Sequence, residues 1–159
     1  MTNHSFYENR QEICRKILDA HHLDGILFVS LENIRYLCGF TGSDAAFVIT
    51  RKEFFFLTDS RYWTQAHEEV KGSQIVHYKK KMEGILSLLS DLRLQKIGFE
   101  SATLPFSAFQ LLSEKLADEA KLVPLEDELK NLRAVKDAHE LALIRKAIDI
   151  SSDAFSHVT

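Results

Sequence analysis

Short apolar runs alternate along this chain with longer segments whose apolar residues recur at helical spacing. The clearest run, residues 25–29 (GILFV), contains no polar side chain and therefore predicts a strand that is covered on both faces. The segments 6–22 and 83–94 each carry an apolar stripe, which predicts amphipathic helices. Strands of this kind are buried in a sheet with helices packed against it, so the alternation predicts an α/β layer fold.

The same patterns predict the remaining elements. Further strands are expected at residues 45–50, 53–58, 74–78, 96–99 and 121–123, and the last of them is expected to end at Pro124. Further helices are expected at residues 31–37 and 61–70. Another helix is expected to have Pro105 in its first helical position. Two β-rich runs flank Arg51 and Lys52, which predicts a hairpin. Because a hairpin joins antiparallel strands, the sheet is expected to be mixed and not purely parallel.

The composition is that of one ordinary globular domain. The chain has 159 residues, of which 45% are hydrophobic and 27% charged, and its net charge is −3. A dedicated nucleic-acid binder is expected to be basic, so we expect no nucleic-acid partner. No apolar stretch approaches the roughly 18 residues that span a bilayer, and the N-terminus lacks the apolar core of a signal peptide. We therefore expect no membrane association and a cytoplasmic location.

Several familiar chemical sites are absent from the sequence. It contains no G-x-G-x-x-G, no G-x-x-x-x-G-K-[ST] and no G-x-S-x-G, which argues against the usual dinucleotide, nucleotide and esterase sites. His139-Glu140 begins like the zinc-protease motif H-E-x-x-H, but Leu143 stands where the second histidine belongs. The seven histidines show no ligand spacing, so we expect no metal site within this chain. Cys14 and Cys38 are expected to be reduced, packed thiols.

The C-terminal segment differs from the rest of the chain. Asp137 and Glu140 have the spacing of a capping box, and the helix that they predict continues without a stop signal. Its apolar residues form two stripes, one with Leu141, Ile144, Ile148 and Phe155 and the other with Leu143, Ala147, Ile150 and Ala154. A helix that is apolar over two faces is normally enclosed. We therefore expect the chain to be the front part of a longer polypeptide; alternatively, this helix packs on its own domain or on a symmetry mate.

Two further segments are unusual for surface loops. Residues 33–43 (NIRYLCGFTGS) place two glycines, two aromatic residues and an arginine on a short helix and the loop that leaves it. Residues 58–62 (TDSRY) lie where a strand ends and a helix begins, and Asp59 or Ser60 is a natural N-cap there. Arg61 lies beside the carboxyl end of that strand, where α/β folds tend to place ligands. The simpler interpretation is an N-cap with a local ion pair between Asp59 and Arg61.

These segments resemble the creatinase/prolidase N-terminal domain of Xaa-Pro aminopeptidases and Xaa-Pro dipeptidases. Residues 33–43 are similar to its N-x-R-Y-L-[TS]-G-F-T-G-S stretch, with Cys38 where Thr or Ser is commoner, and residues 58–62 to its T-D-x-R-Y. Residues 97–100 (IGFE) are similar to its I-G-[FV]-E, and residues 132–147 to its junction with the catalytic domain. The resemblance implies two parts: the N-terminal domain at 1–131, and at 132–159 a linker with the first helix of a catalytic domain.

The fold implied by the resemblance is a three-layer α/β arrangement, a mixed β-sheet flanked by helices on both faces with ribonuclease H-like topology. Nuclease activity is not implied. Nucleases of that fold need carboxylates, including one from the first strand, to hold two metals. Residues 25–29 contain no acidic residue.

The resemblance also implies a division of labour within a longer enzyme. In the family, a pita-bread domain that follows this one holds two divalent metals, commonly manganese, on two Asp, one His and two Glu, and hydrolyses the Xaa-Pro bond at peptide N-termini. The N-terminal domain contributes to oligomerisation and active-site gating. The expected partners are thus its own catalytic domain, a second subunit and proline-containing peptides, and the isolated chain is expected to be inactive.

The resemblance assigns roles to single residues, and none of them is catalytic. Arg61 would reach a substrate carboxylate or a neighbouring acid. Asp59 and Tyr62 would organise the turn. The remaining residues implied at the rim of the active site are Tyr36, Phe40, Thr41, Gly42 and Ser43. Two other interpretations stay open: the N-terminal domain of a creatinase-like C–N hydrolase, and a protein-binding scaffold module without catalysis.

Overall fold

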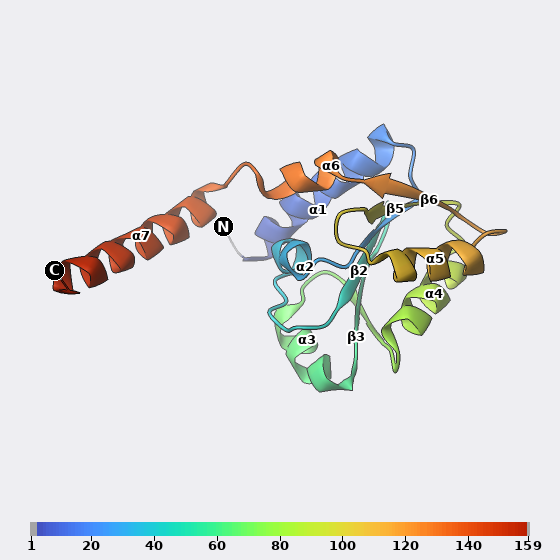
Figure 1. Cartoon of the computed structure of the whole chain (residues 1–159), viewed down its shortest axis with the longest axis horizontal. Helices are drawn as coiled ribbons and strands as arrows, with labels where there is room; N and C mark the ends of the chain where they lie inside the picture. The colour runs from blue at the N-terminus through green and yellow to red at the C-terminus, as the bar shows by residue number, and fades with distance from the viewer. Residues whose placement is uncertain (1–2, 159) are drawn as a thin grey trace.

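A computed structural model describes residues 3–158 of the chain and places a sheet of six strands between two layers of helices (Figure 1). The strands are β1 (Gly25–Phe28), β2 (Ala46–Thr50), β3 (Phe54–Thr58), β4 (Gln74–His77), β5 (Lys96–Glu100) and β6 (Lys121–Leu125). The α-helices are α1 (Asn3–Ala20), α2 (Leu31–Cys38), α3 (Trp63–Glu69), α4 (Lys81–Asp91), α5 (Phe106–Lys115), α6 (Asp127–Lys130) and α7 (Ala138–Val158). Two 3-10 turns, η1 (Ser60–Tyr62) and η2 (Asn131–Arg133), precede α3 and follow α6.

The strand order in the sheet is β4-β3-β2-β1-β5-β6. Strands β1, β2 and β3 pair antiparallel, and the β2–β3 pair is the predicted hairpin. Strand β5 pairs parallel with β1, β6 parallel with β5, and β4 parallel with β3. Three antiparallel strands continued by two parallel ones are the ribonuclease H-like arrangement, so the mixed three-layer α/β fold is confirmed.

The sheet is buried on both faces because its central strands alternate their side chains between two apolar clusters. In β1, Ile26 and Phe28 point into one cluster and Leu27 into the other, and all three are fully buried. The cluster around Phe28 is covered by α1, α2, α3 and the segment with α6 and η2. The cluster around Leu27 is covered by α4 and α5. The continuous apolar run at residues 25–29 is therefore explained by helices on both sides.

The structure corrects the predicted ends of two elements. Strand β6 does not stop before Pro124: it runs to Leu125, and Pro124 stands opposite Phe99 of β5. Because β6 is the last strand of the sheet, the missing N–H of Pro124 leaves no neighbouring strand without a donor. The start of α5 is the second correction: Pro105 is the N-cap of this helix and not its first helical residue.

Helix α7 leaves the domain and extends away from it (Figure 1). The predicted capping box is present: the N–H of Glu140 donates to Oδ1 of Asp137 over 2.9 Å, and the N–H of Asp137 donates to Oε2 of Glu140 over 3.0 Å. The large apolar residues of the two predicted stripes are exposed, so α7 does not pack on the domain. Among the helices of residues 3–158, none combines the length and apolarity needed to span a bilayer.

Candidate functional site

The predicted rim loop begins where α2 ends. Ser30 caps the start of α2 by accepting a hydrogen bond from the N–H of Asn33. Gly39 ends the helix with φ at 86°, and its N–H donates to the carbonyl oxygen of Arg35. This left-handed conformation favours glycine, which explains why the helix stops there and the chain turns into residues 40–44.

Helix α3 holds this loop through one carboxylate. The N–H of Thr41 donates to Oε2 of Glu69 over 2.7 Å, and its hydroxyl donates to Oε1 over 2.8 Å. Gln65, one turn before Glu69, donates to both the Thr41 hydroxyl and the Glu69 carboxylate. Partial burial raises the pKa of Glu69, but the hydrogen bonds from Thr41 and Gln65 outweigh it and leave the pKa below its usual value.

Aromatic rings support the loop from below. Phe40 is buried, and its ring centroid lies 4.7 Å from that of Phe56 and 5.7 Å from that of Tyr62. Gly42 lies against the same rings, since a Cβ atom there would come within 2.3 Å of Phe40 Cζ and 2.8 Å of Tyr62 Cδ1. The hydroxyls of Ser43 and Tyr62 are 2.5 Å apart. Phe40 therefore anchors the loop, and Thr41 and Ser43, on either side of Gly42, are both exposed.

Arg61 lies beside the loop in a group of charges. Its guanidinium donates to Oδ2 of Asp59 from Nε over 2.9 Å and from Nη2 over 2.6 Å, and Nη2 lies 3.4 Å from Asp44. Asp59 also caps η1 by accepting the N–H of Arg61, so both the predicted N-cap and the predicted ion pair are present. The hydrogen bond from Arg61 lowers the pKa of Asp59. Lys81 also pairs with Asp44, and the side chain of Arg61 is 64% exposed although it pairs with Asp59 and Asp44.

Tyr36 lies in a different environment from the other predicted rim residues. Its ring lies under the guanidinium of Arg10, whose central carbon is 3.8 Å from the ring centroid, and Arg10 Nη1 donates to the Tyr36 carbonyl over 2.8 Å. Arg10 Nη2 also lies 3.0 Å from Asp137 and 3.5 Å from Glu140, the two capping residues of α7. The structure thus brings together Phe40, Thr41, Gly42, Ser43, Asp59, Arg61 and Tyr62, and places Tyr36 beside α1 and α7.

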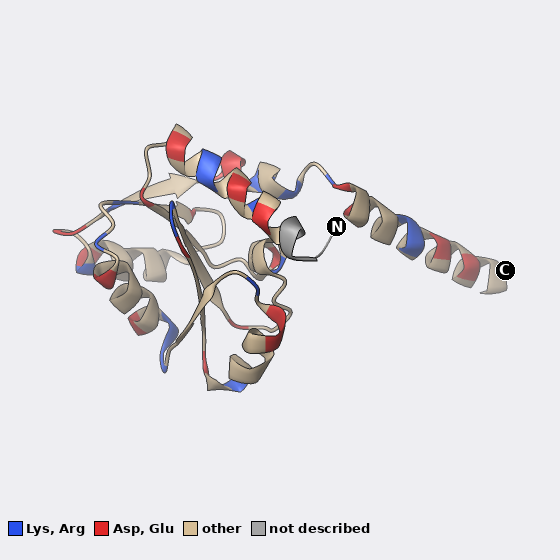
Figure 2. Cartoon of the chain, turned by 180° about the vertical axis from the view of Figure 1, so that it is seen from behind, with Lys and Arg blue, Asp and Glu red and all other residues tan. Residues whose placement is uncertain are grey.

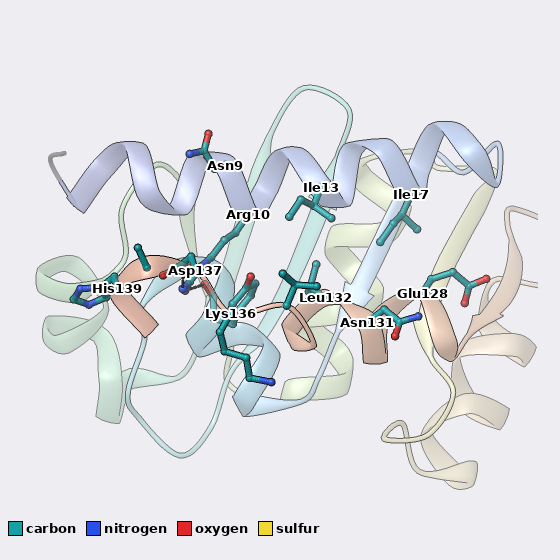
Figure 3. Close-up of a pocket in the computed structure, with 13 residues that line it drawn as sticks. Asn9, Arg10, Ile13, Ile17, Glu128, Asn131, Leu132, Lys136, Asp137 and His139 are labelled. Atoms are coloured by element: carbon teal, nitrogen blue, oxygen red, sulfur yellow. Dashed lines mark hydrogen bonds and ion pairs between the residues drawn. The ribbon is translucent and has the colours of Figure 1, made fainter. Parts of the chain in front are cut away.

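A groove runs along α1 on the side where Tyr36 lies (Figure 3). We call it the α1 groove: a cavity of about 870 Å³ between α1 and residues 128–139. Apolar side chains line its length, and polar ones lie among and around them. The apolar residues are Ile13 and Ile17 from α1, with Leu132 and Val135 from the opposite wall. Ala138 and His139, the first residues of α7, close one end.

A buried carboxylate joins two of the sequence motifs. Glu100, at the end of β5, is 3% exposed and accepts hydrogen bonds from the N–H groups of Val29 and Ser30 over 2.5 and 2.7 Å. The side-chain amide of Asn33 donates to its other oxygen over 2.6 Å. Sequence reasoning noted Glu100 only as the last residue of the IGFE match. A carboxylate that follows three apolar or glycine residues at the end of a strand was the sequence signal that Glu100 is buried and hydrogen-bonded.

The described residues offer no metal centre and no reactive thiol. No group of three or more His, Cys, Asp or Glu within residues 3–158 could hold a metal ion. Cys14 and Cys38 are buried free thiols, and burial raises the pKa of each to about 12. A thiol with such a pKa is almost entirely protonated at neutral pH and is a poor nucleophile.

Comparison with known proteins agrees with the fold. Residues 10–135 match the Creatinase/Prolidase N-terminal domain family. The uncharacterized peptidase YqhT of Bacillus subtilis (strain 168) is 32% identical over 148 residues, which cover 92% of this chain and 42% of that protein. The chain therefore spans less than half the length of this relative.

Solved structures give the same result. The Xaa-Pro dipeptidase from Bacillus anthracis superposes with a TM-score of 0.88 at 29% identity, over 96% of this chain and 42% of that one. The N-terminal domain of the cytoplasmic peptidase PepQ from Mycobacterium tuberculosis H37Rv superposes with a TM-score of 0.73 at 26% identity, over 79% of this chain and 98% of that domain. With a family match that extends over most of its residues, this chain belongs to the creatinase/prolidase N-terminal domain family.

Proposed function

We propose that this chain is the non-catalytic N-terminal domain of a longer peptidase that cleaves the Xaa-Pro bond at peptide N-termini. The observation that supports it is the coverage: over nearly all of its own length the chain matches peptidases that are more than twice as long. The catalytic domain would then be formed by residues outside 1–159. It would hold two divalent metals, which are commonly manganese in this family. The residues described here do not fit a dinuclear centre, so no chemical step is assigned to them.

The proposed role of the domain is to gate the active site and to contribute to oligomer contacts. The rim loop supports this role because it is held on both sides, by Glu69 and by the ring of Phe40, and still presents Thr41 at the surface. A loop held in this way keeps one shape, which is what a rim against a substrate or a second subunit requires. Arg61 is the cation proposed to bind a carboxylate there, in exchange for Asp59.

The activity can be tested with the complete reading frame and with residues 1–159 alone. Loaded with Mn²⁺, the complete protein is expected to hydrolyse an Xaa-Pro dipeptide or a longer peptide with proline in the second position, and residues 1–159 are expected to hydrolyse neither. Metal-dependent cleavage by residues 1–159 would contradict the proposal. So would hydrolysis of a creatine-type C–N bond in place of the peptides by the complete protein, or no hydrolysis at all.

The rim role of Arg61 can be tested in the complete protein. Arg61→Ala is expected to lower kcat/KM or to change the oligomer size, and Lys52→Ala, in the exposed β2–β3 turn, is expected to do neither. Arg61→Lys keeps the charge but loses the fork of donors, so its effect is expected to lie between the two. Equal kinetics and equal oligomer size for all three variants would contradict the rim role.

We also propose the domain boundary after Asn131, with residues 132–159 as linker and first helix of the catalytic domain. Leu132 lies one residue past this boundary and is 5% exposed in the core. A chain that ends at Asn131 is therefore expected to unfold cooperatively, but with a free energy of unfolding about 2–3 kcal/mol below that of a chain ending at Val135. Urea unfolding measures both free energies, and non-cooperative unfolding of the chain that ends at Asn131 would contradict the boundary.

A further inference from the structure

The sheet has one outer strand whose edge is open. Its two outer strands are β4 and β6, and Pro124 interrupts the row of N–H donors along the outer side of β6. Strand β4 contains no proline and no Lys, Arg, Asp or Glu, and none of its four residues is buried. We call the outer side of this strand the β4 edge. An edge of this kind can pair with a further strand.

The backbone groups of Ile75 and His77 point out of the β4 edge. Tyr78, directly after the strand, donates its N–H to the carbonyl oxygen of Thr58 over 3.0 Å. Because backbone groups alternate between the two sides of a strand, Val76 faces β3 as Tyr78 does, and Ile75 and His77 face away from β3. In the described part of the chain no other strand pairs with them. Each therefore offers one donor and one acceptor.

Two different surfaces flank the β4 edge, one on each face of the sheet. On the side of α4, a cavity of about 230 Å³ is lined by Val76 from the strand and by Gly84 and Leu88 from the helix, among others. On the side of α3 lies Trp63, which is 40% exposed and has its ring 5.8 Å from that of His77. An added strand would alternate its side chains between these two surfaces.

The β4 edge is basic at the end where the chain enters α4. Lys79 and Lys80 are exposed and line the same cavity, and in Figure 2 the chain is blue at this point. Lys80 pairs with Glu83 over 2.7 Å, whereas Lys79 has no ion pair among the described residues. Two copies joined antiparallel through β4 would bring this end of one copy toward the exposed Lys71 of the other, and like charges repel. An acidic peptide would instead be attracted.

The same end of β4 lies beside the proposed rim. His77 stands opposite Thr58 in the register of β3 and β4, and the chain passes from Thr58 directly through Asp59 to Arg61. A bound peptide that passes Arg61 would therefore reach the β4 edge at His77 and continue toward Gln74. Such a peptide runs antiparallel to β4, because its N-terminus lies at the rim.

We propose that the β4 edge binds the part of a substrate peptide that follows its proline, as an added antiparallel strand. The inference rests on the proposed function and narrows its substrate class to peptides that extend several residues past the proline and carry acidic side chains there. Ile75 and His77 would each form two backbone hydrogen bonds with the peptide. Its side chains would alternate between Trp63 and the cavity beside α4, with a carboxylate at Lys79. An Xaa-Pro dipeptide ends before it reaches this edge.

NMR measures binding on residues 1–159 without any hydrolysis. The probe is a decapeptide with proline in the second position, followed by two glutamates and then by alternating threonine and valine. At millimolar concentration, the amide protons of Ile75 and His77 are expected to move downfield because they gain acceptors. The amide of Val76, which faces β3, is expected to move less. The indole N–H resonance of Trp63, the only tryptophan, is expected to shift as well.

Two N-methylated forms of the decapeptide are the controls. Methyl groups on every second backbone nitrogen block one edge of the peptide strand, so methylation at odd positions and methylation at even positions block opposite edges. One form is expected to lose binding and the other to keep it. Equal effects of the two methylation patterns would overturn the proposal, as would unmoved amides of Ile75 and His77 with the unmethylated decapeptide.

Kinetics of the complete protein test the link to the substrate. The measured quantity is the ratio of kcat/KM for the decapeptide to kcat/KM for an Xaa-Pro dipeptide. Lys79→Glu is expected to lower this ratio roughly fivefold, since it replaces an attraction by a repulsion at an exposed site. Lys121→Glu, at an exposed position of the other outer strand, is the control and is expected to leave the ratio unchanged.

The two measurements separate this inference from the proposed function. Hydrolysis of both substrates with an unchanged ratio in Lys79→Glu would reject the β4 edge as a substrate site and keep the proposed function. Shifted amides of Ile75 and His77 in a protein that hydrolyses neither substrate would reject the proposed function, and β4 would remain a peptide-binding edge without a substrate role.

Discussion

Asn33 donates a hydrogen bond from Nδ2 to Oε1 of Glu100 over 2.6 Å, and both side chains are buried. Asn33 begins the motif that contains the rim loop, and Glu100 ends the IGFE motif 67 residues later. The two motifs are therefore parts of one hydrogen-bonded joint, in which the end of β5 holds the turn from β1 into α2. The helix that leads to the rim loop is oriented from this joint.

Glu100→Gln is expected to lower the free energy of unfolding by about 2–3 kcal/mol. A glutamine can place its oxygen on the N–H groups of Val29 and Ser30, but its nitrogen then faces the Asn33 Nδ2 donor, and the charge that strengthens all three hydrogen bonds is lost. Urea unfolding measures the change. Glu114→Gln, at an exposed position of α5, is the control and is expected to change stability by less than about 0.5 kcal/mol. Equal stability of both variants would contradict the claim that the hydrogen bonds of Glu100 stabilise the fold.

The attachment of the rim loop to Glu69 is expected to depend on pH. The pKa of Glu69 is lowered in the folded protein, so its contribution to stability is complete above the usual glutamate pKa of about 4.3 and is lost as the pH falls through the depressed value. The amide proton of Thr41, which donates to Glu69, reports this directly by NMR. Its chemical shift is expected to move upfield on acidification below that range.

Two variants check that this titration belongs to Glu69. In Glu69→Gln the Thr41 amide is expected to lose its acid transition, and in Glu68→Gln, at the exposed neighbouring position, the transition is expected to remain. An acid transition that persists in Glu69→Gln would assign it to another carboxylate.

Gly42→Ala is expected to displace the rim loop. The backbone of Gly42 is not in a left-handed conformation, so the effect comes from contact: the new methyl group would lie 2.3 Å from Phe40 and 2.8 Å from Tyr62. Overpacking of this kind typically lowers stability by about 1–3 kcal/mol. Ser43→Ala, which removes only the hydroxyl that meets Tyr62, is expected to lose about 1 kcal/mol. Wild-type stability of Gly42→Ala in urea unfolding would show that the loop yields without loss.

Arg10→Met is expected to release α7 from its fixed direction. The variant keeps an apolar stem against Tyr36 but loses the donors to the Tyr36 carbonyl and to Asp137. With spin labels at Lys71→Cys and Asp153→Cys, the distance distribution is expected to be narrow in the parent protein and broad in Arg10→Met. Arg15→Met is the control because Arg15 pairs with Glu12 of its own helix. A narrow distribution in Arg10→Met would mean that the Asp137 cap alone orients α7.

The sequence alone determined those features that depend on neighbours along the chain. The uninterrupted run at residues 25–29 specified a strand covered on both faces, and the spacing of Asp137 and Glu140 specified a helix start. The Asp59–Arg61 pair followed in the same way from residues two positions apart. Periodicity and caps are local, since they arise from 3.6 residues per turn, from the alternation of a strand and from backbone groups within one turn.

Tertiary structure alone decided which distant residues meet. Glu69 holds Thr41 from 28 residues away, and Arg10 reaches Asp137 across 127 residues, and neither pair leaves a pattern in the sequence. Pro124 continues β6 because that strand came to lie at the edge of the sheet, which depends on strand order. Such contacts depend on the strand order and on how the helices pack over the sheet. The same local patterns are compatible with other strand orders and other helix packings, so the local sequence does not determine them.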